Sequence, residues 1–192
     1  FKSRPVWIAG STHPGEEEVI LKAHKQLLNQ FPDSLLIIAP RKPERFNSVH
    51  KVIIDSGYAS VRWSDFKSLE DNIEVLLIDT LGDLPFFYSA SDVAFVGGSL
   101  FAIGGHNLLE PASFGTPVIS GPFLQNVKEI STELIEVGGL LVVKDDKELS
   151  IQLNKLLADN SKKDQMVSAA DKVMHDNKGS IENIMKLIKP FI

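Results

Sequence analysis

The sequence predicts an α/β fold built on a doubly wound parallel sheet, and two observations support this prediction. Short apolar runs alternate along the chain with amphipathic stretches of helical period. Most of these runs lack alternating polar residues, which is typical of strands that helices cover on both faces. Strands that alternate with helices favour a parallel sheet, because each helix carries the chain back to the same edge.

Seven apolar runs are predicted to be buried strands. They are Val6–Ala9, Leu35–Ala39, Ala59–Trp63, Val75–Asp79, Val93–Val96, Pro117–Ser120 and Leu140–Val143. Helical patterns lie between them at Glu16–Gln30, at Glu44–Ile54 after Pro43, and at Asn126–Val137 before the C-cap signal Gly138-Gly139. From Asp146 onward the pattern predicts three further helices with no strand between them.

Length, composition and charge limit the functions that the chain can have. The 192 residues suffice for one sizeable domain, and 43% apolar with 23% charged residues excludes a disordered chain. The absence of cysteine excludes disulfides, cysteine nucleophiles and thiolate metal sites. A net charge of −5 weighs against unspecific nucleic-acid binding, and no apolar run reaches the roughly 18 residues of a membrane span. Because the chain starts at Phe1, we expect a fragment or a processed product.

The loop after the first predicted strand has two glycines that enclose four residues, Gly10-Ser11-Thr12-His13-Pro14-Gly15-Glu16-Glu17. This spacing is similar to a phosphate loop, which needs Lys and then Ser or Thr after the second glycine. Glu16 and Glu17 stand there instead and would repel a triphosphate, which argues against an ATPase. The alternative is a plain loop before a helix whose first turn favours acids.

Two further loops follow predicted strands. The first of them has three cations near the start of a helix, in the segment Pro40-Arg41-Lys42-Pro43-Glu44-Arg45-Phe46. The helix dipole favours anions at that end, so the cations are unfavourable there unless an anion binds beside them. The alternative is ordinary solvated surface charge. Asp79-Thr80-Leu81-Gly82-Asp83-Leu84 offers a hydroxyl and a close backbone approach, although any turn has such features.

The loop after the fifth strand carries the strongest signal, because Gly97-Gly98-Ser99-Leu100 and Gly104-Gly105-His106-Asn107 bring four glycines within nine positions. Pro111 fits a first helical turn, so a helix should start within residues 107–110 and offer the backbone N–H groups of 105–107 to a phosphate. The alternative is a capping-box pair of Asn107 and Glu110. The spacing matches neither a dinucleotide fingerprint, nor a Walker A motif, nor a nucleophile elbow.

The remaining candidates are Gly121-Pro122, with Asn126 as an N-cap of the next helix, and the five histidines. No two histidines stand four positions apart, so no zinc helix motif is present. His24, His50 and His175 lie in helical patterns and are interpreted as surface or packing residues. His13 and His106 lie in glycine-rich loops and are candidates for ligand contact.

The ordered motifs resemble one known family over nearly the whole chain, the transferases of 3-deoxy-D-manno-oct-2-ulosonic acid (Kdo). The resemblance rests on Ala9-Gly10-Ser11-Thr12-His13, Gly15-Glu16, Pro40-Arg41, Pro43-Glu44-Arg45-Phe46, Asp79-Thr80, Gly97-Gly98-Ser99-Leu100, Gly104-Gly105-His106-Asn107, Leu109-Glu110 and Gly121-Pro122. Each motif is weak alone, but their joint order and spacing are specific.

The resemblance implies the Rossmann-like C-terminal domain of a GT-B glycosyltransferase, a single domain over residues 1–192 that binds the nucleotide sugar CMP-Kdo. It implies an N-terminal domain, absent from this chain, that binds the lipid A precursor and carries the membrane anchor and a carboxylate general base. The fragment would hold no catalytic residue and would be inactive alone. The whole enzyme would serve lipopolysaccharide core synthesis at the cytoplasmic face of the Gram-negative inner membrane, with no metal, cofactor or nucleic acid.

The resemblance also implies the donor-binding residues. They are Ser11, Thr12, His13, Arg41, Arg45, Thr80, Gly82, Gly98, Ser99, Gly104, Gly105, His106, Asn107 and Glu110. Arg41 would contact the donor's anionic groups, the backbone of 104–107 would face phosphate or sugar, and Glu110 would accept hydrogen bonds from the ribose.

Three positions depart from the family pattern. The family often has His after Pro-Arg, where this chain has Lys42. The family segment after Gly-Pro often contains His and ends in Asn-Phe, whereas this chain has Phe123 and Val127 there. Contacts from residues 123–127 are therefore open. Two other functions also remain open, a UDP-sugar-dependent GT-B transferase or epimerase and a non-catalytic docking module.

Overall fold

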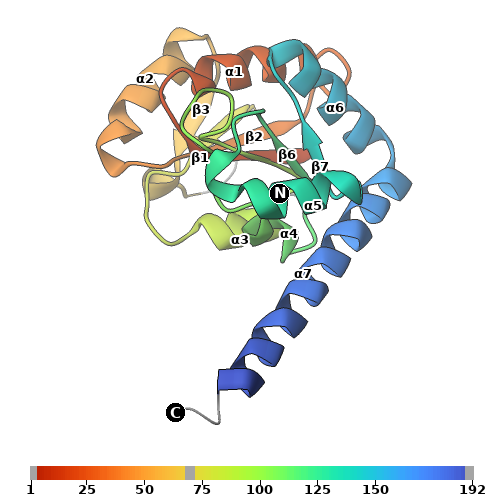
Figure 1. Ribbon diagram of the computed structural model, residues 1–192. Coiled ribbons are helices and arrows are strands. Elements are labelled where there is room, and N and C mark those ends of the chain that lie inside the picture. Colours follow the sequence, from red (N-terminus) through yellow and green to blue (C-terminus); the bar gives the residue numbers. More distant parts are fainter. Residues whose placement is uncertain (1–3, 68–71, 189–192) are drawn as a thin grey trace.

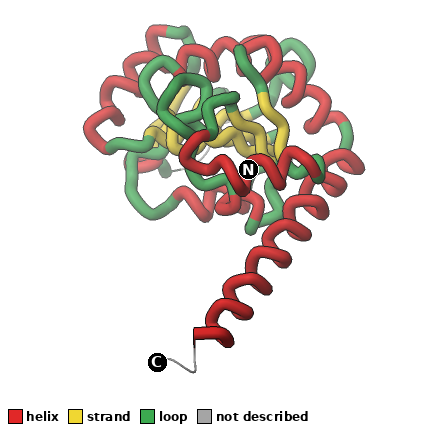
Figure 2. The backbone as a smooth tube through the Cα atoms, in the orientation of Figure 1, coloured by secondary structure: helices red, strands yellow, loops and turns green. Residues whose placement is uncertain are grey.

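The computed structural model describes residues 4–67 and 72–188, with side chains up to residue 176. Its centre is a seven-stranded sheet in the order β3-β4-β2-β1-β5-β6-β7, and every pair of neighbouring strands is parallel. Helices lie on both sides of this sheet (Figure 2). The predicted doubly wound α/β fold is confirmed.

All seven predicted strands form. They are β1 (Val6–Thr12), β2 (Leu35–Pro40), β3 (Ser60–Arg62), β4 (Val75–Leu77), β5 (Val93–Val96), β6 (Val118–Ser120) and β7 (Leu140–Val142). The helices are α1 (Glu16–Leu27), α2 (Phe46–Asp55), α3 (Leu84–Ser89), α4 (Leu109–Ala112), α5 (Lys128–Glu136), α6 (Asp146–Ala158) and α7 (Asn160–Ile188). Short 3-10 turns stand at Pro43–Arg45, Trp63–Asp65 and Gln125–Val127.

The strands lack polar alternation because both faces of the sheet are buried. On one face Trp7 and Ala9 of β1 pack with residues of α1, α2 and α6. On the other face Val6 and Ile8 pack with Phe87 and Tyr88 of α3 and its neighbours. A third cluster joins β5, β6 and β7 to α4, α5 and α7. Continuous apolar strands therefore reflect a sheet between two helical layers.

One helix prediction is corrected, and one helix was not predicted. The three helices expected after Asp146 are two, α6 and α7, because the single Gly179 does not end α7 and the helix continues to Ile188. Helix α7 leaves the sheet and projects away from the body of the domain (Figure 1). The six-residue helix α3 was not predicted, because Leu84–Ser89 is too short to show a helical period.

The topology brings two distant loops together. The chain moves from β1 to β2 on one side of the sheet and later to β5 on the other side, so β1 and β5 are neighbours at the point where strand order reverses. In open α/β sheets, ligands bind beyond the carboxyl ends of the strands at this point. The loops after β1 and β5 meet there, and the backbone N–H of Gly97 donates to the carbonyl of Gly10 over 2.8 Å.

In the described part of the chain, no helix has both the length and the apolarity that a membrane crossing requires.

Candidate functional site

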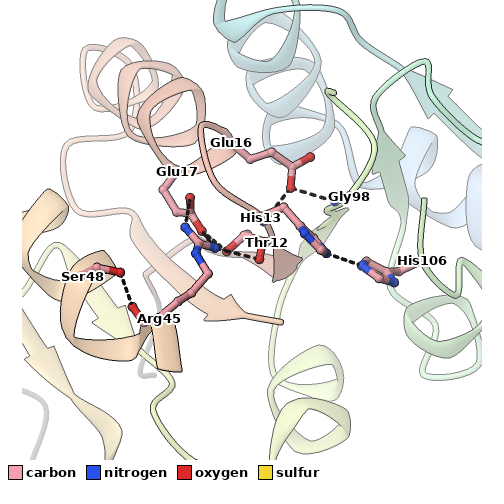
Figure 3. A network of polar contacts seen from close by, with 8 residues as sticks. All are labelled: Thr12, His13, Glu16, Glu17, Arg45, Ser48, Gly98 and His106. Atoms are coloured by element: carbon pink, nitrogen blue, oxygen red, sulfur yellow. Dashed lines mark hydrogen bonds and ion pairs between the residues drawn. The ribbon is translucent and has the colours of Figure 1, made fainter. Parts of the chain in front are cut away.

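The carboxylate of Glu16 joins the loops that follow β1 and β5 (Figure 3). It accepts hydrogen bonds from the backbone N–H of Gly98 at 2.7 Å, of Ser99 and Leu100 at 2.9 Å each, and of His13 at 2.9 Å. The Glu16 side chain is fully buried, so these four donors supply the hydrogen bonds that water would otherwise supply. Its role is to fix the loop geometry rather than to face a ligand.

The neighbouring Glu17 forms a paired fork with Arg45. The two guanidinium nitrogens of Arg45 donate to the two Glu17 carboxylate oxygens at 2.8 and 2.9 Å, and the hydroxyl of Thr12 donates to the same carboxylate at 2.6 Å. Glu17 and Thr12 are buried. Arg45 and Thr12, both predicted to contact the donor, thus have these polar groups engaged within the protein.

His13 and His106 face each other across the site (Figure 3). Their Nε2 atoms lie 2.8 Å apart, and the two rings stack with centroids 5.0 Å apart and an angle of 18° between their planes. Burial lowers the pKa of both imidazoles. For His106, the charges of His13 and Arg41 lower the pKa further, whereas for His13 the nearby Glu16 carboxylate partly opposes the effect of burial.

Close packing accounts for two of the glycines in the loop after β5. A Cβ atom on Gly97 would lie 2.7 Å from the Ser11 carbonyl oxygen, and one on Gly98 would lie 2.8 Å from the His106 ring. Gly98 also has a φ of +68°, which disfavours any side chain. The sequence predicted that these glycines serve a geometric purpose, and contacts within the protein supply it. Glycine lets the loops after β1 and β5 pack closely at Gly97 and lets the histidine pair pack against Gly98.

The backbone of the glycine-rich loop corrects the expectation for residues 105–107 at Gly105, and the part on His106 and Asn107 stays a prediction. The N–H groups of Gly104 and Gly105 both donate to the Gly98 carbonyl, at 3.1 and 2.7 Å, so they are not offered to a phosphate. Helix α4 starts at Leu109, within the predicted range, and the Asn107 side-chain oxygen accepts the N–H of Leu109 at 3.0 Å. The Asn107 side chain thus bridges the turn before α4, whose N-cap residue is Leu108 and which has no side-chain cap.

Arg41 and Glu110 are the charged candidates whose side chains remain available. Arg41 is exposed, and no carboxylate of a described residue lies within ion-pair distance of its guanidinium. Glu110 is half-buried, and among the described residues none donates a hydrogen bond to its carboxylate. Burial and then the Glu110 charge raise the pKa of Tyr88, whose hydroxyl lies against Gly10. Arg41 and Glu110 thus keep charged groups that no described residue engages.

The other predicted residues either have their polar groups hydrogen-bonded within the protein or are at least partly exposed to solvent. The Thr80 hydroxyl donates to Asp83, and Gly82 is exposed with a φ of +92°. The Ser99 hydroxyl is buried between the Val96 carbonyl and the Gly121 N–H. Ser11 is half-buried and adopts a φ of +56° where β1 has a bulge.

The interpretation of Asn126 as an N-cap is wrong. Asn126 lies in the 3-10 turn before α5, and its side-chain amide donates to the Ile103 carbonyl at 3.2 Å, while α5 has no side-chain cap. Its amide lies so close to Gly104 that a Cβ there would be 2.2 Å from it. A cavity of about 430 Å³ lined by residues 125–130 opens beside it. Among the described residues, no cluster of three or more potential ligands is placed to hold a metal.

Sequence reasoning missed the joining roles of Glu16 and Glu17 and the place of Tyr88. Two acids at a helix start and a basic trio 24 to 29 positions later were both visible, but nothing in the sequence pairs them. Tyr88 lies in a short apolar stretch that carries no functional signal.

Comparison with known proteins now identifies the chain, because the family of glycosyl transferases group 1 matches residues 3–173. The chain belongs to this family. The 3-deoxy-D-manno-octulosonic acid transferase of Haemophilus influenzae is 40% identical over 192 residues, which is 100% of this group 1 chain and 45% of the relative. The transferase of Aquifex aeolicus is 39% identical over 79% of this chain and 41% of its own length. The predicted resemblance to Kdo transferases is confirmed.

A solved structure supports the same relation. The C-terminal CMP-Kdo binding domain of WaaA from Acinetobacter baumannii is 34% identical to this group 1 chain, covers 90% of both chains and superimposes with a TM-score of 0.86. WaaG, a glycosyltransferase of lipopolysaccharide biosynthesis, is 14% identical with a TM-score of 0.58, which shows a shared fold alone. The chain spans less than half the length of the curated relatives described above.

Proposed function

We propose that this chain is the donor-binding half of a transferase that moves Kdo from CMP-Kdo to a lipid A precursor. The observation that carries the proposal is the likeness to the CMP-Kdo binding domain from Acinetobacter baumannii, with its TM-score of 0.86 over 90% of both chains. Residues 1–192 act as one nucleotide-sugar-binding domain. The acceptor site belongs to the rest of the transferase, which works at the cytoplasmic face of the inner membrane.

Local charge explains how an acidic domain binds an acidic donor. CMP-Kdo carries a phosphodiester and a carboxylate, whereas the chain has a net charge of −5, so long-range attraction is not the source of affinity. The guanidinium of Arg41 has no ion-pair partner among the described residues, and its planar fork of donors suits an oxoanion. The carboxylate of Glu110 accepts hydrogen bonds from the ribose hydroxyls.

The reaction is a direct displacement at the anomeric carbon of Kdo with inversion. The acceptor hydroxyl oxygen forms the new bond to that carbon, and its proton passes to a carboxylate of the acceptor-binding half. The bond between the anomeric carbon and the phosphate oxygen breaks, and CMP leaves with the electron pair. Arg41 stabilises the negative charge on the departing phosphate.

Titration calorimetry with CMP, UDP and CMP-Kdo tests the proposal on this chain. We expect heat with CMP and CMP-Kdo and much weaker binding of UDP. Tighter binding of UDP than of CMP would favour the UDP-sugar-dependent alternative. If millimolar concentrations of every nucleotide left both the heat and the melting temperature unchanged, a docking module would be the better interpretation.

A further inference from the structure

The contact between His13 and His106 limits the number of protons that the two rings can hold. Their Nε2 atoms lie 2.8 Å apart, so one Nε2 donates a proton and the other accepts it. Two doubly protonated rings would point two N–H groups at each other across this distance. The pair therefore holds either no positive charge or one, and the added proton occupies the ring nitrogen that the neutral donor ring leaves free.

The charges that act on the pair come from two segments, the first turn of α1 and residues 41–45 after β2. On the side of His13 they are Glu16, Glu17, Arg45 and Lys42, and on the side of His106 the charge is Arg41. Glu17 and Arg45 neutralise each other in their ion pair, and the Glu16 carboxylate already accepts four backbone N–H groups. Arg41 and Lys42 are exposed and have no ion-pair partner among the described residues. Both favour the neutral form of the pair, Arg41 at His106 and Lys42 at His13, whereas the Glu16 charge opposes them at His13.

A ligand anion reverses this balance. Burial is the main cause that lowers the pKa of His106, and the charges of His13 and Arg41 add to it. An anion held by Arg41 cancels the Arg41 contribution and adds a negative charge near both rings. Gly98 packs against both rings, with His106 at 2.8 Å and His13 at 3.5 Å from the position of a Cβ, so the pair cannot withdraw into the loop. Both histidines are half-buried rather than fully enclosed, which leaves a path for a proton from solvent.

We propose that the His13–His106 pair acts as a single proton acceptor that takes up a proton from solvent when the donor's anionic groups bind beside Arg41, so that donor binding is coupled to protonation of the site. This inference rests on the proposed function. The bound proton gives the pair one positive charge and one further N–H donor. It makes both histidines specificity-determining residues for an anionic donor, beyond their role in joining two loops.

Calorimetry in two buffers of different ionisation enthalpy tests the coupling, because the difference in heat counts the protons taken up. The probes are CMP and the methyl phosphodiester of CMP, which lacks the phosphate group that itself titrates near pH 6. At pH 6.5 we expect uptake of roughly half a proton or more per methyl ester bound, and an affinity that falls up to about tenfold per pH unit above that. The variant His106→Gln should bind with no proton uptake.

His50→Gln serves as the matched control, since His50 is a half-buried histidine on α2 beside Ser60 rather than in the site. This variant should keep the proton uptake of the wild type. Binding without proton uptake by the wild type overturns the inference and leaves the proposed function standing, even if the His106 variant does not fold. Equal proton uptake by the wild type and the His106 variant also overturns the inference and leaves the proposed function standing. No binding of any cytidine ligand overturns both.

Discussion

The carboxylate of Glu16 lies 2.7 Å from the backbone nitrogen of Gly98, across 82 residues of sequence. This contact ties the first turn of α1 to the loop after β5, and three further N–H groups share the same carboxylate. The loop that carries the candidate site is therefore held in shape before any ligand arrives. Such preorganisation lowers the cost of ordering the loop on binding.

The first prediction concerns this carboxylate. Glu16→Gln replaces one acceptor oxygen by an amide that must face backbone N–H donors, so we expect a loss of about 3 kcal/mol in the free energy of unfolding. Urea denaturation measures the change. Glu18→Gln is the control, because Glu18 is exposed in the same helical turn and its substitution should leave stability nearly unchanged. Equal effects of the two substitutions would contradict the role assigned to Glu16.

The second prediction separates the two arginines of the basic loop. Arg41→Ala should weaken CMP binding by about 1.5–3 kcal/mol, or roughly 10- to 150-fold, with little change in melting temperature. The reason is that Arg41 is exposed and pairs with no described carboxylate. Calorimetric titration and thermal denaturation measure the two effects. Lys42→Ala, the neighbouring exposed cation, controls for a loss of general positive charge and should bind CMP nearly as well as the wild type.

The third prediction is the opposite behaviour of Arg45. Arg45→Met leaves the buried Glu17 carboxylate without its partner, so we expect a loss of roughly 3 kcal/mol in stability. The double variant Arg45→Met with Glu17→Gln removes both charges and should recover part of the loss, as a double-mutant cycle in urea would show. A stable Arg45→Met variant that fails to bind CMP would instead make Arg45 a donor contact.

The fourth prediction concerns Glu110. Glu110→Ala removes a carboxylate that accepts no hydrogen bond from a described residue, so CMP binding should weaken while the melting temperature stays nearly constant. Deoxycytidine monophosphate lacks one ribose hydroxyl, so its affinities for the variant and the wild type should differ less than those of CMP do. Glu129→Ala, an exposed acid in the first turn of α5, is the control. A variant that mainly loses stability would support the capping interpretation of Glu110.

The fifth prediction uses the buried His24, which accepts the indole N–H of Trp7 at 3.1 Å. Burial lowers its pKa from 6.5 to about 4, so the unfolded chain binds a proton at a higher pH than the folded chain does. The stability that neutral His24 contributes is therefore complete above pH 6.5 and is lost as the pH falls toward 4, by about 3 kcal/mol. Urea denaturation between pH 7 and pH 4 should show a flatter pH dependence for His24→Gln, whereas the exposed His175→Gln should follow the wild type.

The local sequence determined most of the fold of this group 1 chain. Uninterrupted apolar runs predicted all seven strands, and the breaks at Gly15 and Gly138 marked where helices begin and end, because backbone preference and burial act over a few residues. The order of the motifs was also sufficient to indicate the family. The short helix α3 and the length of α7 escaped prediction, since neither depends on a strong local period.

Only the tertiary structure decided which polar residues are available to a ligand. Arg41 and Arg45 look equivalent in the sequence, yet Arg45 meets Glu17 from 28 residues away, and Arg41 pairs with no carboxylate in the part of the chain that the structure describes. His13 and His106 become one unit across 93 residues, and the N–H groups of Gly104 and Gly105 are taken by Gly98. Such pairings depend on which strands the sheet makes neighbours, and that choice is made by the packing of the whole core rather than by any local pattern.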